Sequence, residues 1–364
     1  MGSATLFHLA RRGVRVLGLE QYSQGHTLGS SHGDSRIIRE TYFEHPLYVP
    51  PVQRAHDLWR ELEETSGLSL MRIVGGLMIG PPTGAVVTGT LRSTREHKLP
   101  HEKLSATEIH GRFEPFQTDA DLVGIFDPRA GYLDPEACTG AHLDAAVRSG
   151  ATAHFNEAVV AWTADGTSVT VKTASDSYSA AHLVLAGGAW NGALAAELRL
   201  PLTIERQSVF WLDPTGDPAY EADRFPIYAY EYKPGHICYG FPRLPRGVKA
   251  SVMHSGETVS TPSQIRRTVQ ESEVEPLRAA LRPVLPGLAS APVREQTTCI
   301  FTNTPDHDFI IDWHPEHPSV LISSPCSGHG FKFASAIGEV QADLITEGAT
   351  HFDLAPFSLA RFAV

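Results

Sequence analysis

The chain has 364 residues, of which 42% are hydrophobic and 20% are charged, a balance that excludes disordered, collagen-like and coiled-coil proteins. Its 30 basic and 41 acidic side chains give a net charge of -11, which argues against a nucleic-acid or anionic-membrane partner. At roughly 150 residues per domain, the length predicts about two domains. The 4 cysteines are too few for a disulfide framework, and no apolar run is long enough to span a membrane. We therefore expect a cytoplasmic protein.

Residues 1–20 show the pattern of an apolar helix followed by a buried strand. Apolar residues recur at helical spacing from position 4 to position 10, and Gly13 suits the end of that helix. Residues 14–19 are typical of a buried parallel strand, and Glu20 follows at its end. In a dinucleotide-binding unit an acidic residue at this place binds the ribose, and Gly2 stands where the glycine turn would end. The same residues also suit an ordinary helix–strand pair that opens any α/β domain.

Further elements of α/β type follow along the chain. Asp134, Pro135 and Gly150 suit the two ends of a helix between them. The glycines at 187–188 lie between a strand and a helix, where backbone N–H groups face an anion or a flat ligand. The pattern predicts helices and strands over these ranges: helices 54–65, 136–149 and 331–346, and strands 74–79, 169–171, 182–185, 308–314 and 319–323.

The segment 201–295 has a different character. Short β-like runs alternate with turns rich in proline and glycine, at 208–212, 227–232, 236–241 and 248–253. This alternation predicts an antiparallel sheet. Because α/β segments enclose it on both sides, we expect two domains that are each built from discontinuous pieces.

Six stretches in order along the chain carry a family resemblance. They are GSSHGDSRIIRETYFEHPLYVP (29–50), AGGAWN (186–191), CYGFP (238–242), CIFTNTPDHDFIID (299–312), SGHGFKFASAIGEV (327–340) and FDLAPFSLARF (352–362). Together they resemble the family of monomeric sarcosine oxidase and N-methyl-L-tryptophan oxidase, flavoenzymes of the D-amino-acid-oxidase-like superfamily. Each motif alone is modest, but their ordered coincidence over nearly the whole chain is specific.

The resemblance implies an α/β fold with an α+β insert. A Rossmann-like FAD-binding domain would comprise 1–72, 136–200 and 294–364, and an antiparallel-sheet substrate domain would comprise 73–135 and 201–293. Family members open with a strand and a complete glycine turn, whereas this chain begins inside that turn, so the first strand is lacking. We expect upstream in-frame DNA to encode a β-branched strand ending in Gly-x-Gly, and the chain as written to be poorly soluble and to hold FAD weakly.

The resemblance assigns substrate-binding and catalytic residues. Arg39 and Lys332 would bind the substrate carboxylate, although Arg39 by itself would suit an ordinary solvated arginine. Arg36 would lie beside the flavin ring. Lys249 would sit over the flavin and assist reduction of O2 by stabilising developing negative charge.

Two further catalytic assignments concern strand residues. Tyr239 matches an active-site tyrosine of the family. The active-site histidine usually follows the lysine by four residues, but that position is Met253 here. Because a strand alternates its faces, His254 would serve only if a bulge intervenes.

The resemblance also names the residues that would hold the cofactor. Cys299 would form a thioether to the flavin, so that FAD is attached covalently. Phe301, two residues on, stands where relatives often have tyrosine and would make the pocket more apolar. The remaining cofactor-binding residues would be Gly2, Glu20, Gly187, Gly328, Gly330 and Phe331.

The implied function is oxidation of sarcosine or N-methyl-L-tryptophan, which gives formaldehyde and the primary amino acid while O2 is reduced to H2O2. The resemblance also implies a monomer whose partners are the small N-methyl amino acid substrate and O2. One alternative is another FAD-dependent amino-acid oxidase or dehydrogenase of the same superfamily. A second alternative is a zinc site, because His314, His317, Cys326 and His329 have ligand chemistry at plausible spacing. A third is an inactive fragment, favoured only if the missing N-terminal strand is a real loss.

Overall fold

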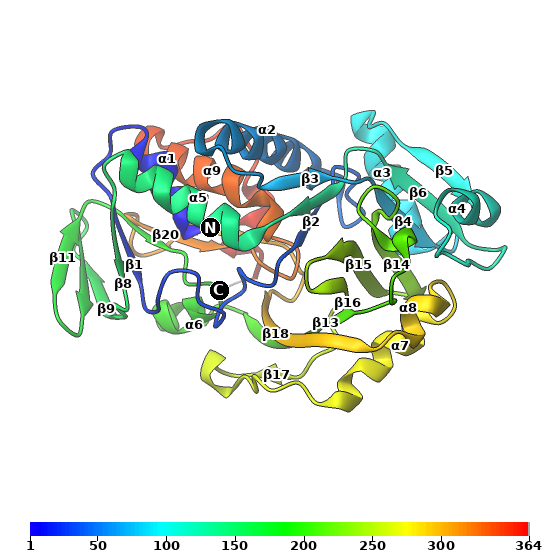
Figure 1. The fold of residues 1–364 in the computed structure, drawn as a ribbon. Helices are drawn as coiled ribbons and strands as arrows, with labels where there is room; N and C mark the ends of the chain where they lie inside the picture. Colours follow the sequence, from blue (N-terminus) through cyan, green and yellow to red (C-terminus); the bar gives the residue numbers. More distant parts are fainter. Residues whose placement is uncertain (363–364) are drawn as a thin grey trace.

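Four helices form one side of the molecule in the computed structural model, which describes residues 1–362 (Figure 1). Helix α1 packs against α9 and α5, and α2 packs against α9. Their bounds are Gly2–Ala10 for α1, Val49–Ser66 for α2, Pro135–Arg148 for α5 and Ala334–Glu347 for α9. The predicted helices in these four regions are confirmed. A short 3-10 turn, η7, Phe331–Phe333, precedes α9 at the predicted start of that helix.

Local sequence explains why these helices begin and end where they do. The Asp134 side chain caps α5 by accepting a hydrogen bond from the Ala137 N–H at 2.8 Å, and Pro135 occupies the first turn. Gly67 ends α2 in the left-handed conformation with φ +72°, which favours glycine. The apolar face of α1 is buried, as its spacing predicts.

Two small parallel arrangements lie beneath the helices. Strand β1 (Leu17–Glu20) pairs in parallel with β8 (Thr152–Phe155), and β12 (Leu183–Leu185) pairs in parallel with β20 (Val320–Ser324). Strand β19 (Ile310–Trp313) extends the second sheet on the far side of β20. Within residues 1–362, β1 and β12 each have a strand on one side only, and the expected missing first strand stays a prediction.

A nine-stranded sheet forms the other half of the fold, mostly antiparallel as predicted. Strand β18 pairs along its whole length with β13. The strands are β4 (Gly76–Gly80), β5 (Glu102–Ser105), β6 (Val123–Asp127), β13 (Thr203–Leu212), β14 (Ile227–Lys233), β15 (His236–Leu244), β16 (Gly247–Val252), β17 (Thr258–Val259) and β18 (Val293–Asn303). Residues 294–303, which were assigned to the FAD-binding domain, therefore lie in this large sheet, while the domain boundaries as a whole stay a prediction.

The remaining elements border this frame. One three-stranded sheet joins segments far apart in sequence, and another stands at the left edge of Figure 1. They are β2 (Arg36–Ile38), β7 (Gly131–Leu133) and β3 (Met71–Ile73), and β9 (Val159–Ala164), β10 (Val169–Thr173) and β11 (Ser177–Ala180). The other helices are α3 (Ala85–His97), α4 (Ala106–Arg112), α6 (Asn191–Leu194), α7 (Glu275–Leu281) and α8 (Pro286–Ser290). Among the described residues, no helix combines the length and apolar character needed to cross a bilayer.

Candidate active site

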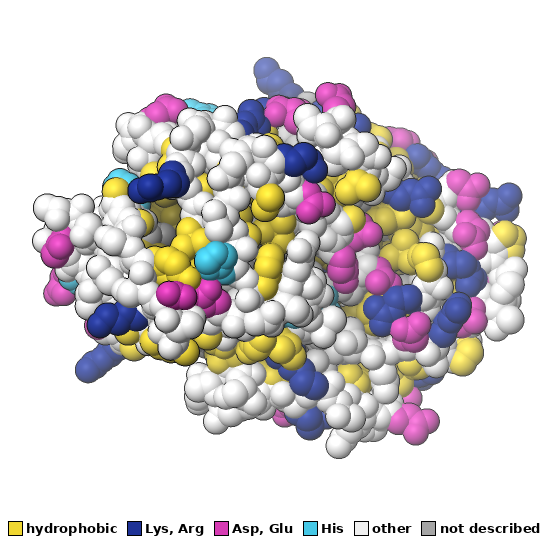
Figure 2. All heavy atoms as spheres, turned by 60° about the vertical axis from the view of Figure 1, so that its left-hand side comes forward, with side chains coloured by type: hydrophobic (Ala, Val, Ile, Leu, Met, Phe, Trp, Pro, Cys, Tyr) yellow, Lys and Arg dark blue, Asp and Glu magenta, His cyan; other side chains and the backbone are white. Residues whose placement is uncertain are grey.

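A cavity of about 1260 Å³ runs between the two halves of the fold. Figure 2 shows hydrophobic side chains exposed within a hollow on one face of the molecule. All but one of the predicted site residues line this cavity, namely Gly2, Glu20, Arg36, Arg39, Gly187, Tyr239, Lys249, Cys299, Gly328, Gly330, Phe331 and Lys332. The cavity therefore brings together residues from both ends of the chain.

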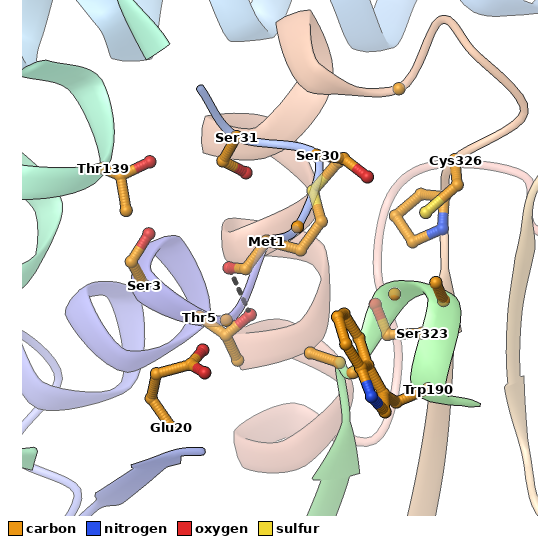
Figure 3. Close-up of a pocket in the computed structure, with 18 of the residues that line it drawn as sticks. Met1, Ser3, Thr5, Glu20, Ser30, Ser31, Thr139, Trp190, Ser323 and Cys326 are labelled. Carbon is orange, nitrogen blue, oxygen red and sulfur yellow. Dashed lines mark hydrogen bonds between the residues drawn. The ribbon is translucent and has the colours of Figure 1, made fainter. Parts of the chain in front are cut away.

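The amino end of α1 forms one wall. Met1, Ser3 and Thr5 line the cavity there, and Glu20 stands at the end of β1 beside them (Figure 3). The first N–H groups of a helix have no partner within the helix, and its amino end carries partial positive charge. The Glu20 carboxylate accepts a hydrogen bond from the Tyr22 N–H at 2.9 Å. An anion at the helix end and a hydroxyl group at Glu20 would both find partners here.

The turn after β12 faces the same wall. The Asn191 side chain accepts a hydrogen bond from the Gly187 N–H at 2.8 Å and donates one to the Ser323 carbonyl at 2.8 Å. A Cβ atom at Gly187 would lie 2.7 Å from the end of the Leu194 side chain and 3.0 Å from the Asn191 side-chain oxygen, so the turn leaves little room for a side chain here. The turn thus brings bare backbone to the cavity.

Lys249 fastens the loop that precedes β2. Its ammonium donates to the carbonyls of Gly33 at 2.6 Å and Ser35 at 2.8 Å, while Glu136 accepts from the Gly33 N–H on the other side. Burial, with the charge of Arg36, lowers the pKa of Lys249 well below its usual value. The lysine therefore combines a structural role in the loop with a place on the cavity wall.

Arg36 and Cys299 meet across the cavity wall. One guanidinium nitrogen of Arg36 donates to the Ser30 carbonyl at 2.7 Å and lies 3.5 Å from the Cys299 sulfur. The other nitrogen donates to the Ser35 carbonyl at 2.7 Å, so the arginine is fixed from two sides. A positive group this close interacts favourably with negative charge on the sulfur.

Arg39 is already paired in this structure. Its guanidinium contacts the Glu44 carboxylate at 2.6 Å and stacks on the rings of Tyr42 and Phe43. Desolvation acts to raise the pKa of Glu44, but Arg39 and its cationic neighbours outweigh it and lower that pKa. Glu44 was not found from the sequence, because an acidic residue five positions after an arginine in a loop gives no signal.

Lys332 lies in a second polar network beside Arg39. Its ammonium donates to the His329 carbonyl at 2.7 Å and lies 3.4 Å from the Tyr42 hydroxyl. That hydroxyl in turn contacts the His329 ring nitrogen at 2.6 Å. Desolvation, together with the charge of Arg39, lowers the pKa of Lys332 to about 7. Tyr42 is a further residue of this site that sequence reasoning missed.

The two strand residues of the resemblance have different positions. Tyr239 lines the cavity, and burial raises its pKa to about 12. Met253 also lines the cavity, whereas His254 is not among the lining residues. His254 has φ +51° and contacts the Glu205 carboxylate at 3.1 Å. Both residues lie in the turn that follows the last residue of β16, Val252, so strand alternation does not decide which of them faces the cavity, and the catalytic role of His254 stays a prediction.

The four residues of the zinc alternative do not form one cluster. His314 contacts Glu197 at 3.0 Å and lies beside the tilted ring of His317, whereas His329 contacts Tyr42. In the part of the chain that the structure describes, no group of three or more histidine, cysteine or acidic side chains is placed to hold a metal. We therefore set the zinc alternative aside.

Comparison with known proteins agrees with this geometry. Residues 1–344 match the family described as FAD dependent oxidoreductase. The chain belongs to this family. It is 40% identical to the monomeric sarcosine oxidase of Streptomyces avermitilis, over all of this chain and 95% of that relative. It is 33% identical to an N-methyl-L-tryptophan oxidase of Yersinia pestis, over all of this chain and 96% of that relative. The solved L-proline dehydrogenase of P. horikoshii has a TM-score of 0.85 over 99% of this chain and 94% of that chain at 20% identity, which shows the fold alone.

The residues of this oxidoreductase fit FAD. The cavity exceeds the roughly 300–1,000 Å³ of ordinary ligand pockets, as a dinucleotide requires. The buried His32 side chain lines it, and its Nε2 has no hydrogen-bond partner among the described residues. Burial, with the charge of Arg36, lowers the pKa of His32 to about 3, so a neutral ring faces the cavity. A bound polar group would satisfy that nitrogen.

Proposed function

We propose that this enzyme oxidises the N-methyl group of secondary amino acids such as sarcosine or N-methyl-L-tryptophan. The carrying observation is that two buried cationic side chains, Arg39 and Lys332, line the same cavity as Lys249, Arg36 and Cys299. Named relatives along the full chain support this substrate class. In the overall reaction the CH–NH bond is oxidised to an imine, water releases formaldehyde and the primary amino acid, and O2 is reduced to H2O2.

The residues of the chain bind and orient the substrate, while FAD, when bound, accepts the hydride and passes the electrons to O2. Lys332 supplies a buried ammonium for the substrate carboxylate. Arg39 supplies a planar guanidinium, for which the carboxylate competes with Glu44. Holding the carboxylate at this end orients the N-methyl carbon toward the part of the cavity near Cys299 and Lys249.

Peroxide release tests the proposed function. Sarcosine, N-methyltryptophan, N-methylalanine and pipecolate should be compared on flavin-loaded enzyme, because the sequence does not distinguish among these substrates. Peroxide with an N-methyl substrate supports the proposal. If the flavin-loaded enzyme releases no peroxide with any of the four substrates, the proposal is contradicted. Turnover of other amines alone would favour another amino-acid oxidase or dehydrogenase.

The covalent link through Cys299 is part of this proposal. Cys299→Ser is expected to give flavin that leaves the protein on acid precipitation, whereas wild-type flavin stays with the pellet. The reason is that serine cannot form the thioether, although it preserves the side-chain size beside Arg36.

Cys326→Ser is the matched control, because Cys326 also lines the cavity. We expect its flavin to remain in the pellet. Flavin that stays bound in Cys299→Ser after denaturation would point to a different attachment residue.

A pH dependence follows from Lys332. Acetate, a carboxylate without an amine, should bind more weakly as the pH rises through about 7, because Lys332 is charged below its pKa and neutral above it. Loss of a hydrogen bond to a charged group predicts about tenfold weaker binding or more. Flavin absorbance during acetate titration measures the dissociation constant.

Lys332→Met should bind acetate weakly at every pH, without the change near 7. An unaltered pH profile in this variant would show that another group titrates.

The monomeric state and the cytoplasmic location stay predictions. Light scattering on the purified enzyme tests the monomeric state.

A further inference from the structure

Tyr42 stands behind the part of the cavity wall that carries Arg39 and Lys332. Its side chain is fully buried and does not line the cavity, so it would act on a substrate only through its neighbours. The guanidinium carbon of Arg39 lies 4.3 Å from the centroid of its ring, and its hydroxyl lies 3.4 Å from the Lys332 ammonium. One buried tyrosine therefore contacts both cations of the proposed carboxylate site.

The direction of the hydrogen bonds around Tyr42 depends on His329. The Nε2 atom of His329 lies 3.0 Å from the His307 carbonyl oxygen, which can only accept, so this nitrogen carries a proton. Burial lowers the pKa of His329 to about 4, so at neutral pH the ring is uncharged and holds one proton only. The Nδ1 atom is therefore without a proton and is an acceptor.

This tautomer determines how the Tyr42 hydroxyl points. The hydroxyl oxygen lies 2.6 Å from Nδ1 of His329, and because that nitrogen has no proton, the hydroxyl must donate its own. Burial also raises the pKa of Tyr42, so the proton stays on the oxygen. The lone pairs of that oxygen are then left to accept from the Lys332 ammonium.

Aromatic packing holds the His329 ring in this orientation. The ring stacks on Phe309 with centroids 4.9 Å apart, and Tyr48 meets it edge to face with centroids 5.2 Å apart. The His307 carbonyl belongs to a turn in which His307 has φ +60° and its N–H donates to the Thr304 carbonyl at 3.2 Å. Both partners of the Nε2 hydrogen bond are thus fixed by their surroundings.

The Lys332 ammonium has a defined direction as a result. It donates to the His329 carbonyl at 2.7 Å as well as to the Tyr42 oxygen, so within residues 1–362 two of its three N–H groups have partners. Because Lys332 lines the cavity, the third N–H is available to a carboxylate there. A lysine that is already held in place loses less side-chain freedom when a ligand binds.

We propose that Tyr42 and His329 are positioning residues that hold the Lys332 ammonium toward the substrate carboxylate. His329, as the tautomer protonated at Nε2, turns the Tyr42 hydroxyl so that its oxygen accepts from Lys332. The inference rests on the proposed function for the identity of the ligand, whereas the tautomer and the hydrogen bonds are properties of the chain alone.

Nitrogen-15 NMR of the flavin-loaded enzyme with labelled histidine tests the tautomer. The signals of the His329 ring are identified by their loss in His329→Gln. At about pH 7 we expect one protonated ring nitrogen, Nε2, because the His307 carbonyl fixes the proton there. A ring protonated at Nδ1, or at both nitrogens, would overturn the proposal, whatever substrates the enzyme turns over.

Tyr42→Phe removes the hydroxyl and keeps the ring beside Arg39. Below pH 7 acetate should bind about fivefold more weakly than to wild type, the factor for one ordinary net hydrogen bond. Lys332 also loses an acceptor for its charged form, so its pKa should fall and acetate binding should be lost at a lower pH than in wild type. Arg39 lowers and Glu44 raises the pKa of the same lysine, and both stay in place.

Tyr48→Phe is the matched control. Tyr48 is also buried against His329, but its hydroxyl donates to Asp308 at 2.6 Å rather than to the lysine. Its acetate affinity and pH profile should match wild type. The double variant Tyr42→Phe/Lys332→Met should bind acetate no more weakly than Lys332→Met alone, because Tyr42 acts through that lysine.

The outcomes separate this inference from the proposed function. Acetate binding that is the same in Tyr42→Phe and wild type at every pH would show that the hydroxyl does not position Lys332. A similar loss in Tyr48→Phe, or a further loss in the double variant, would reveal a general packing effect and would equally overturn the proposal. If the NMR and acetate results are as expected and no N-methyl substrate releases peroxide, the proposed function fails and the positioning role stands.

Discussion

Lys249→Met is expected to slow reoxidation by O2 about 100-fold, the loss typical when one electrostatic stabiliser is removed. Negative charge develops on O2 as it accepts an electron, and the Lys249 ammonium lines the cavity where the proposed flavin would lie. Reduction by substrate should be much less affected, because Lys249 is not one of the carboxylate-binding pair. Stopped-flow measurement of the two half-reactions separates these effects.

The pH dependence of reoxidation is an independent test of the role of Lys249. Burial lowers the pKa of Lys249, and only the protonated form carries the charge that helps O2. Wild-type reoxidation should therefore slow as the pH rises through that pKa, and Lys249→Met should lack this change. Reoxidation that is as fast in the variant as in wild type would show that Lys249 does not activate O2.

Lys249 also fastens the loop at Gly33 and Ser35, so its variant needs a structural control. Lys332→Met removes another buried lysine from the same cavity and should alter substrate binding while leaving reoxidation nearly unchanged. A fall in Tm for Lys249→Met would report the lost loop contacts. It would not by itself account for a selective effect on O2.

Regular periodicity made much of the fold predictable. The helices α2, α5 and α9 have apolar faces or clear caps, and the strands β13 to β16 are bounded by turns rich in glycine and proline. Strand β18 shows where prediction was weaker. Its residues pair with β13 residues that lie 81 to 100 positions earlier in the chain, a long-range contact that local pattern does not report.

The site residues likewise include some that the sequence predicts and some that depend on long-range contacts. Positions within motifs, such as Lys249, Cys299 and Lys332, could be named from the sequence, because their motifs carry a family resemblance. Glu44 and Tyr42 also lie in a quoted stretch, 29–50, but were not named, because their contacts depend on how the loop after β2 folds back toward His329. These missed partners determine the charge state and availability of the residues that were predicted.

Arg39→Ala is expected to raise the KM for an N-methyl amino acid about 100-fold, since a hydrogen bond to a charged group contributes ~1.5–3 kcal/mol. The change in kcat should be small, because Arg39 binds the carboxylate in the ground state and the transition state alike. Part of the loss should come from Glu44, which the substitution leaves without its partner beside the substrate carboxylate.

Glu44 makes this prediction sharper. Glu44→Gln alone should lower KM, because the neutral amide competes less strongly for Arg39. The double variant Arg39→Ala/Glu44→Gln should have a lower KM than Arg39→Ala, because the repulsion between two carboxylates is gone. Arg54→Ala is the matched control: Arg54 also pairs with a glutamate, Glu339, but does not line the cavity, so its KM should stay unchanged. An unchanged KM in Arg39→Ala would remove Arg39 from the carboxylate site and leave Lys332 as its cation.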